Sequence, residues 1–110
     1  MTLSELQELA FHNSMDKGFW EGEPGTLSIV EKLALIHSEV SEALECLRSN
    51  KGIDSWFGPG GKPEGLGTEL ADVVIRTADL CGALGLDLQS LVEVKMEYNK
   101  TRPRKHGKAF

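Results

Sequence analysis

The stretches Glu39-Val40-Ser41-Glu42 and Glu69-Leu70-Ala71-Asp72 decide which fold and which chemistry this sequence predicts. Each stretch carries two carboxylates three residues apart inside an apolar helical pattern. Residues at positions i and i+3 of a helix are surface neighbours, with Cβ atoms about 5–6 Å apart, so each stretch can aim two oxygen ligands at one point. Four carboxylates gathered from two packed helices repel one another unless a hard cation such as Mg²⁺ or Mn²⁺ sits among them. The four acids therefore predict one shared metal site.

Apolar residues that recur at helical spacing predict four helices and no strand, over about residues 3–15, 28–50, 68–84 and 87–101. Signals for helix ends support these limits: capping-box spacings at Thr2 and Ser28, a glycine at Gly85 and an N-cap at Asp87. A chain of 110 residues has the size of one domain. We expect a single all-α domain over residues 1–110, a bundle-like arrangement of four helices with irregular loops at about 16–26 and 51–67 and a basic tail at 102–110.

The two acid pairs stand in the same relation to the apolar faces of their helices. One helix presents an apolar face made of Leu33, Ile36, Val40, Leu44 and Leu47, and the other presents Leu70, Val73, Val74, Thr77, Cys81 and Leu84. Antiparallel helices that bury equivalent faces against each other bring both acid pairs to the same side of their seam. A single E-x-x-E is usually a charged helix edge, whereas two pairs with matched offsets favour a metal site.

Charge and hydropathy exclude several classes of protein. The net charge of −5 combines an acidic body with a basic C-terminal stretch, residues 95–110. An acidic body argues against a broad nucleic-acid surface, and the basic stretch is either a solvated terminus or a local phosphate-binding segment. No apolar run of about 18 residues and no basic-then-apolar leader is seen, so we expect no membrane span, no secretory signal and a cytoplasmic location.

Cysteine and histidine residues do not form a recognisable site. Cys46 and Cys81 lack CxxC spacing, so we expect reduced, packed thiols. His12, His37 and His106 form no pair that would suggest zinc, so each is expected to be structural.

Aromatic residues in the two loops admit two interpretations each. Phe19 and Trp20 lie in a Gly-rich connection, where they either anchor the loop on the core or offer a stacking surface to a planar ligand. Trp56 is either a plug for the core or a lid that stacks on a base. The glycines of the second loop match neither G-x-x-x-x-G-K-[ST] nor G-x-G-x-x-G after a strand, so no phosphate-binding loop is predicted.

Basic and amide side chains on the last helix can meet one anion together. Lys95, Asn99 and Arg102 fall at i, i+4 and i+7, which places them along one face. Arg76, on the helix that carries the second acid pair, can pair with an acid or bind a phosphate. The sequence therefore holds anion-binding candidates in addition to metal ligands.

Taken together, the motifs resemble the MazG-like branch of the all-α nucleoside triphosphate pyrophosphohydrolases. The resemblance rests on Glu39-x-x-Glu42, Glu69-Leu-Ala-Asp72-Val and Lys95-x-x-x-Asn99-x-x-Arg102-Pro, in the family's order, and covers about residues 27–107. Many members have a glutamate doublet where this chain has Ser38 before Glu39, and an aromatic residue where it has Arg76. The first departure removes at most an outer ligand, whereas the second bears on the base pocket and hence on substrate identity.

The resemblance implies an enzyme that hydrolyses a nucleoside triphosphate, a deoxyribonucleotide or a modified one, to the monophosphate and pyrophosphate with Mg²⁺ or Mn²⁺. The four carboxylates would hold the metal, with one of them or a neighbouring acid as general base. Lys95 and Arg102 would hold the outer phosphates, Asn99 would bind the substrate, and Phe19, Trp20 or Trp56 would stack on the base.

Members of this family pair or form tetramers, so we expect a homodimer or homotetramer whose assembly completes the bundle. Three alternatives remain open at this stage. The same scaffold can act on phosphoribosyl-ATP, or it can bind nucleotide and metal without turnover. The acidic edges can also be no more than the solvated surface of a structural helical assembly.

Overall fold

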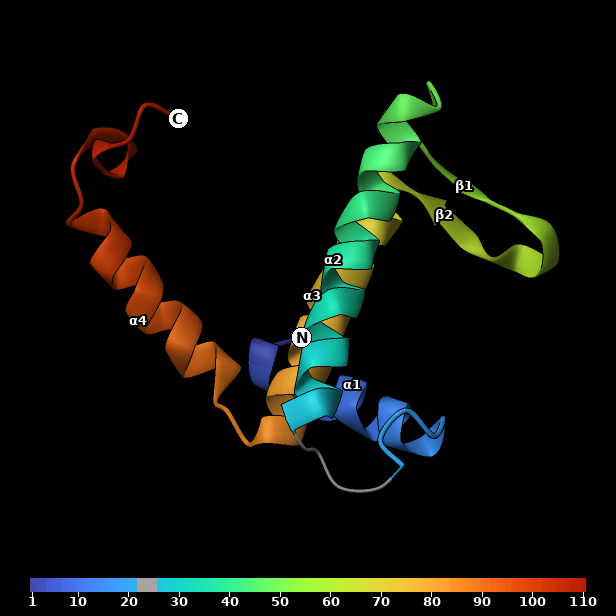
Figure 1. Ribbon diagram of the computed structural model, residues 1–110, viewed down its shortest axis with the longest axis horizontal. Coiled ribbons are helices and arrows are strands. Elements are labelled where there is room, and N and C mark those ends of the chain that lie inside the picture. Colours follow the sequence, from blue (N-terminus) through green and yellow to red (C-terminus); the bar gives the residue numbers. More distant parts are fainter. Residues whose placement is uncertain (22–25) are drawn as a thin grey trace.

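The computed structural model, which describes residues 1–21 and 26–110, is mostly helical (Figure 1). Its four described α-helices are α1 (Leu3–Asp16), α2 (Thr26–Arg48), α3 (Leu66–Leu84) and α4 (Leu88–Lys100). Two strands, β1 (Ser55–Phe57) and β2 (Pro63–Gly65), lie between α2 and α3, and short 3₁₀ turns cover Pro59–Gly61 and Arg104–Gly107. Among the described residues, no helix is both long enough and apolar enough to cross a bilayer. The predominantly helical class predicted from the sequence is confirmed.

Three helices, α1, α2 and α3, pack together. Helices α2 and α3 run antiparallel side by side, and α1 lies against α3 (Figure 1). The buried positions are filled mainly by small side chains, which let the helix axes approach closely: Ala10, Ser14, Ala43, Ala78 and Cys81. Cys46 is half-buried, and both thiols are free, in agreement with the predicted reduced and packed state.

Helix α4 does not complete a four-helix bundle within the chain. It starts beside the C-terminal end of α3 and extends away from α2 and α3 (Figure 1). Its attachment is to α1, where the Gln7 side chain accepts from the backbone N–H of Leu88 at 3.1 Å and donates to the carbonyl of Leu86 at 2.6 Å. The bundle predicted from the sequence is therefore a packed set of three helices and a projecting fourth.

The helix ends follow most of the predicted capping signals. Thr2 and Glu5 form the complete capping box of α1, Gly85 ends α3 in the left-handed conformation with φ 66°, and the Asp87 side chain accepts from the backbone N–H of Ser90. The predicted N-cap at Ser28 is wrong, because α2 already includes Thr26. Part of the predicted 16–26 loop, residues 22–25, lies outside the described residues.

The seam between α2 and α3 uses a different face of α2 from the one predicted. Glu39 is only 8% exposed, whereas Val40 is 49% and Leu44 55% exposed. The helix is rotated so that its acidic flank and Ala43 face α3, which leaves the leucine-rich stripe uncovered within the chain. The prediction of this face was wrong because an apolar stripe on a helix does not by itself show what the stripe packs against.

A β-hairpin occupies the region predicted to be an irregular loop. Strands β1 and β2 pair antiparallel with Trp56 opposite Glu64 and Phe57 opposite Pro63. Gly65 joins β2 directly to α3 with φ 120°, and a Cβ on it would lie 2.5 Å from the carbonyl oxygen of Asp54. Only glycine fits this junction, so the hairpin is fixed to the start of the helix that carries the second acid pair.

The close approach of α1 and α3 at Gly82 gives a test of the packing. A Cβ on Gly82 would lie 2.7 Å from the Cβ of Phe11, whereas a Cβ on Gly67, in the first turn of the same helix, would meet Ser55 Oγ at 3.9 Å. Overpacking costs about 1–3 kcal/mol, which exceeds the helix-propensity gain of up to about 1 kcal/mol. We expect Gly82→Ala to lower the free energy of unfolding and Gly67→Ala to maintain or raise it, as measured by urea denaturation. Equal effects of the two substitutions would contradict this packing.

Candidate metal centre

Three acidic side chains from two helices converge at the α2–α3 seam. One carboxylate oxygen from each of Glu39, Glu69 and Asp72 lies within 4.8 Å of the others. Glu39 is held in the buried face of α2, while Glu69 and Asp72 occupy the first two turns of α3 and are half-buried. An oxygen-only set of donors suits a hard divalent cation such as Mg²⁺ or Mn²⁺.

Glu42, the fourth predicted ligand, adjoins this group from its exposed side. Its carboxyl lies within hydrogen-bonding reach of the Glu69 carboxyl, although Glu42 itself is exposed. The structure thus gathers all four predicted acids, three in a compact set and the fourth beside it. The i, i+3 spacing on each helix accounts for the convergence, because it keeps both members of a pair on the seam side.

Mutual repulsion and burial perturb the acids of this centre. The pKa of Glu69 is raised from 4.5 to about 7, first by desolvation, then by the hydrogen bond and charge of Glu42, and then by the charges of Asp72 and Glu39. Desolvation and Glu39 also raise the pKa of Asp72, while the positive charges of Arg76 and Lys62 oppose that rise. The cluster carries more negative charge than its surroundings neutralise, which is the condition that a bound cation relieves.

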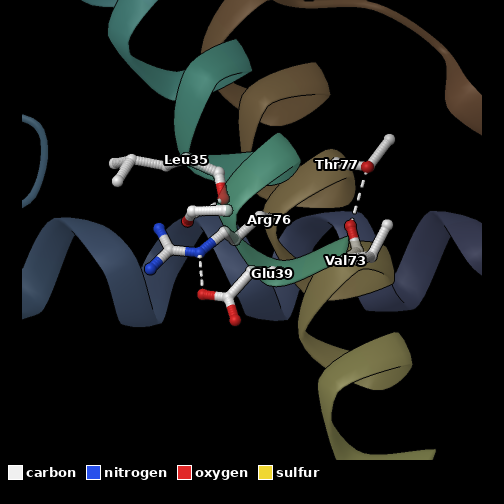
Figure 2. A network of polar contacts seen from close by, with 6 residues as sticks. Leu35, Glu39, Val73, Arg76 and Thr77 are labelled. Atoms are coloured by element: carbon white, nitrogen blue, oxygen red, sulfur yellow. Dashed lines mark hydrogen bonds and ion pairs between the residues drawn. The ribbon is translucent and has the colours of Figure 1, made fainter. Parts of the chain in front are cut away.

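Arg76 pairs with an acid, which is one of the two roles that the sequence left open. Its Nε donates to Glu39 Oε1 at 2.7 Å, across the seam from α3 to α2 (Figure 2). The Glu39 carboxylate is nearly buried, so the guanidinium supplies charge compensation that water cannot. Thr77, the residue after Arg76 in α3, donates its hydroxyl to the Val73 carbonyl one turn earlier in the same helix (Figure 2).

Two cavities lie on opposite flanks of the carboxylates. The first, of about 220 Å³, is bounded on one wall by Glu39, Asp72 and Arg76. It extends to Asn13 of α1 and to Phe19, which follows that helix. The second, of about 330 Å³, is bounded by Glu42 and Glu69 and by the β-hairpin. Glu39 and Asp72 therefore border the first cavity, and their partners Glu42 and Glu69 border the second. A ligand that occupied both cavities would cross the metal centre.

The two tryptophans proposed as stacking residues are already engaged. Trp20 is 7% exposed, its indole N–H donates to Asp79 Oδ1 at 2.7 Å, and Lys32 Nζ lies 4.8 Å from the centroid of its ring. It therefore has the contacts of the core anchor that the sequence offered as its alternative. Trp56 is half-buried, with its indole N–H on Glu64 Oε2 at 2.9 Å and Lys51 over its ring. Phe19, by contrast, is 58% exposed beside the first cavity.

Lys95 and Asn99 lie on α4 and Arg102 just beyond its end, and none of the three lines either cavity beside the carboxylates. Lys95 and Arg102 both approach the Tyr98 ring, at 5.2 and 5.7 Å from its centroid. Asn99 Oδ1 is buried and has no hydrogen-bond partner among the described residues. The projecting course of α4 separates this group from the seam (Figure 1). Sequence spacing predicted their shared face, but it carries no information about where α4 points.

No protein-family model, curated relative or solved structure matches the chain. The carboxylates and the cavities beside them are therefore the features of this chain that point to a function.

The raised pKa of Glu69 predicts how stability changes with pH. Between pH 4.5 and about 7 the folded chain retains a proton that the unfolded chain has released, so the free energy of unfolding falls as pH rises through this window. Glu69→Gln removes this contribution and should flatten the pH dependence of the melting temperature. Because a cation must displace the proton, Mn²⁺ should raise the melting temperature of the unsubstituted protein more at pH 8 than at pH 5.5. A Glu69→Gln protein with an unchanged pH profile would contradict the assignment.

Proposed function

We propose that this protein hydrolyses nucleoside triphosphates, in particular deoxyribonucleotides or modified nucleotides, to the monophosphate and pyrophosphate with a divalent cation. The observation that carries the proposal is the placement of Glu39, Glu69 and Asp72 within 4.8 Å, between two cavities. A triphosphate chain laid across these carboxylates would have its nucleoside end on one flank and its phosphate end on the other. The MazG-like motifs identified in the sequence support the same chemistry.

The residues fit a bound Mg²⁺ or Mn²⁺ ion. Glu39, Glu69 and Asp72 would hold it, because their oxygens already converge and their mutual repulsion falls when a cation binds. When bound, such an ion polarises the phosphoryl group and lowers the pKa of a water molecule. The roles left to the chain itself are to orient the substrate and to move a proton.

Glu42 is suited to accept the proton of the attacking water. It lies outside the set of three close oxygens, it is exposed to solvent, and it contacts Glu69. In the reaction, the water oxygen forms a bond to the α-phosphorus and the bond to the bridging oxygen breaks. Pyrophosphate leaves with that electron pair, and the water proton passes to Glu42 as general base.

The first cavity is suited to the nucleoside. The exposed Phe19 ring gives an apolar surface, Asn13 offers an amide, and Arg76 stands between this cavity and Glu39. Arg76 replaces the aromatic residue common in the resembled family, so its guanidinium can stack on a base or bind the α-phosphate after releasing Glu39. A reorganised Arg76 thus connects substrate binding to the charge on Glu39.

An oligomer would account for both α4 and the uncovered apolar surface. Large apolar side chains are about half-exposed on both seam helices, at Leu33, Val40, Leu44, Leu47, Leu70 and Val74. Helix α4 adds further exposed apolar side chains at Leu91 and Val94. In a homodimer or homotetramer, these surfaces bury one another, and α4 can bring Lys95, Asn99 and Arg102 to the phosphates in a second copy's site.

Pyrophosphate release from a panel of common and deoxyribonucleoside triphosphates, with Mg²⁺, Mn²⁺ or chelator, tests the activity. We expect metal-dependent release that falls by about 100-fold or more in Asp72→Ala, since a ligand to the charge-stabilising cation is lost. Glu31→Ala, which removes an exposed acid elsewhere on α2, should leave the rate unchanged. Retained release in Asp72→Ala would contradict the site, and release of orthophosphate instead of pyrophosphate would contradict the reaction.

Sedimentation equilibrium tests the assembly. We expect at least a homodimer at micromolar concentration, and a shift toward monomer in Leu44→Lys, because a charge on the apolar stripe opposes its burial. Glu31→Lys is the matched control, since helical spacing puts residue 31 on the opposite side of α2 from the stripe. A monomeric unsubstituted protein, or equal dissociation by both lysines, would contradict this interface.

A further inference from the structure

One face of the β-hairpin lines the second cavity. Trp56, Lys62 and Glu64 all border it, whereas their neighbours Ser55, Phe57 and Pro63 do not. This alternation is that of a strand, in which successive side chains point to opposite faces. Lys62 and Glu64 are two residues apart, and Glu64 is the register partner of Trp56. The hairpin therefore presents an indole, a carboxylate and an ammonium group to the carboxylates of α2 and α3.

The hairpin face is held in place by one contact across the strands and one between neighbours on the same side of the hairpin. The Trp56 indole N–H donates to Glu64 Oε2 at 2.9 Å, and Lys62 Nζ lies 3.9 Å from Glu64 Oε1. A Cβ on Gly58 would lie 2.7 Å from Glu64 Oε2, so a glycine is required for the carboxylate to take this position. Because Gly65 joins β2 directly to α3, the position of Lys62 is set relative to Glu69 and Asp72.

Among the residues that the structure describes, the ammonium group of Lys62 has only a weak partner. Its ion pair with Glu64 is long and largely exposed, a type of contact that contributes little to stability. Yet Lys62 is close enough to the metal centre for its charge to act on Asp72. The opposite flank has its own cation, Arg76, whose Nε donates to Glu39 at 2.7 Å. Two lysines thus border the second cavity: Lys51, which lies over the Trp56 ring, and Lys62, whose charge acts on Asp72.

We propose that Lys62 binds the terminal phosphates of the substrate in the second cavity and neutralises the leaving pyrophosphate, with Glu64 and Trp56 as positioning residues. This assignment rests on the proposed function, and it deepens it by giving the triphosphate a direction. The nucleoside lies toward Phe19, the α-phosphate lies at the carboxylates, and the pyrophosphate lies under the hairpin. Negative charge accumulates on the leaving group as the bond to the α-phosphorus breaks, and a fixed ammonium group stabilises it there.

The substitutions Lys62→Ala and Lys62→Arg, with Lys17→Ala as a matched control on the exposed C-terminal end of α1, test the proposal. We expect Lys62→Ala to lower kcat for the hydrolysed triphosphate by about 10- to 100-fold, the effect of losing one charge-assisted hydrogen bond. Lys62→Arg should recover part of that loss, and Lys17→Ala should have no effect. Unchanged kcat in Lys62→Ala would overturn the proposal while the proposed function stands.

Metal binding separates a phosphate-binding role from a structural one. Calorimetric titration with Mn²⁺ alone should show equal or slightly tighter binding in Lys62→Ala, because a positive charge near Asp72 has been removed. A loss of Mn²⁺ affinity would show that Lys62 supports the carboxylates and would overturn the proposal. Glu64→Gln, which keeps an acceptor for Trp56 but removes the charge that attracts Lys62, should lower kcat less than Lys62→Ala; an equal or larger fall would remove Glu64 as a positioning residue.

Binding of inorganic pyrophosphate with Mg²⁺ distinguishes failure of this proposal from failure of the proposed function. Pyrophosphate binding that weakens in Lys62→Ala but not in Lys17→Ala supports the phosphate site even if no triphosphate in the panel is hydrolysed. If the protein hydrolyses a triphosphate but binds pyrophosphate equally well without Lys62, the phosphate-binding role of Lys62 is overturned and the proposed function stands. Absence of both hydrolysis and pyrophosphate binding in the unsubstituted protein overturns both.

Discussion

The repulsion among carboxylates at the α2–α3 seam is the constraint on which the rest of the structure depends. A buried Glu39 and two half-buried acids on α3 oppose close packing of the two helices; burial first, and then the neighbouring carboxylates, raise the pKa of Glu69. Two features compensate. Small residues such as Ala43 and Ala78 let the helices approach without burying more charge, and cations stand on either flank, Arg76 against Glu39 and Lys62 near Asp72. An acid-lined seam is costly to fold, so its presence in place of an apolar one argues for a site.

The features that follow from local periodicity could be predicted from the sequence. Four helices, the capping box at Thr2, the glycine end of α3 and the gathering of both acid pairs all depend on spacings of a few residues. Features that depend on contacts between distant parts of the chain could not be predicted from the sequence. The rotation of α2 depends on which of its faces packs on α3, and the course of α4 depends on contacts between residues far apart in the chain. The hairpin was missed because three-residue strands in a Gly- and Pro-rich stretch give no period to detect.

Rotation of α2 assigns different tasks to its two flanks. The flank with Glu39 and Glu42 enters the seam and faces the cavities, while the flank with Val40 and Leu44 stays uncovered. The three packed helices bury few large side chains, so one chain gains little apolar burial for its length. An assembly that covers the leucine stripe adds the missing burial without touching the acids. One flank of α2 can then contribute apolar burial to stability, while the other flank positions the acids.

The two flanking cations differ in a way that orders the proposed reaction. Arg76 donates from its Nε to the nearly buried Glu39 carboxylate at 2.7 Å, so turning its guanidinium fully toward a substrate would break a short ion pair. Among the described residues, the ion pair of Lys62 is a long, exposed one with Glu64, which would cost little to break. If the proposed function is correct, we therefore expect the phosphates of the substrate to bind first on the hairpin side. A cation held by the carboxylates would share the neutralisation of Glu39, and Arg76 could then turn toward the first cavity at a lower cost.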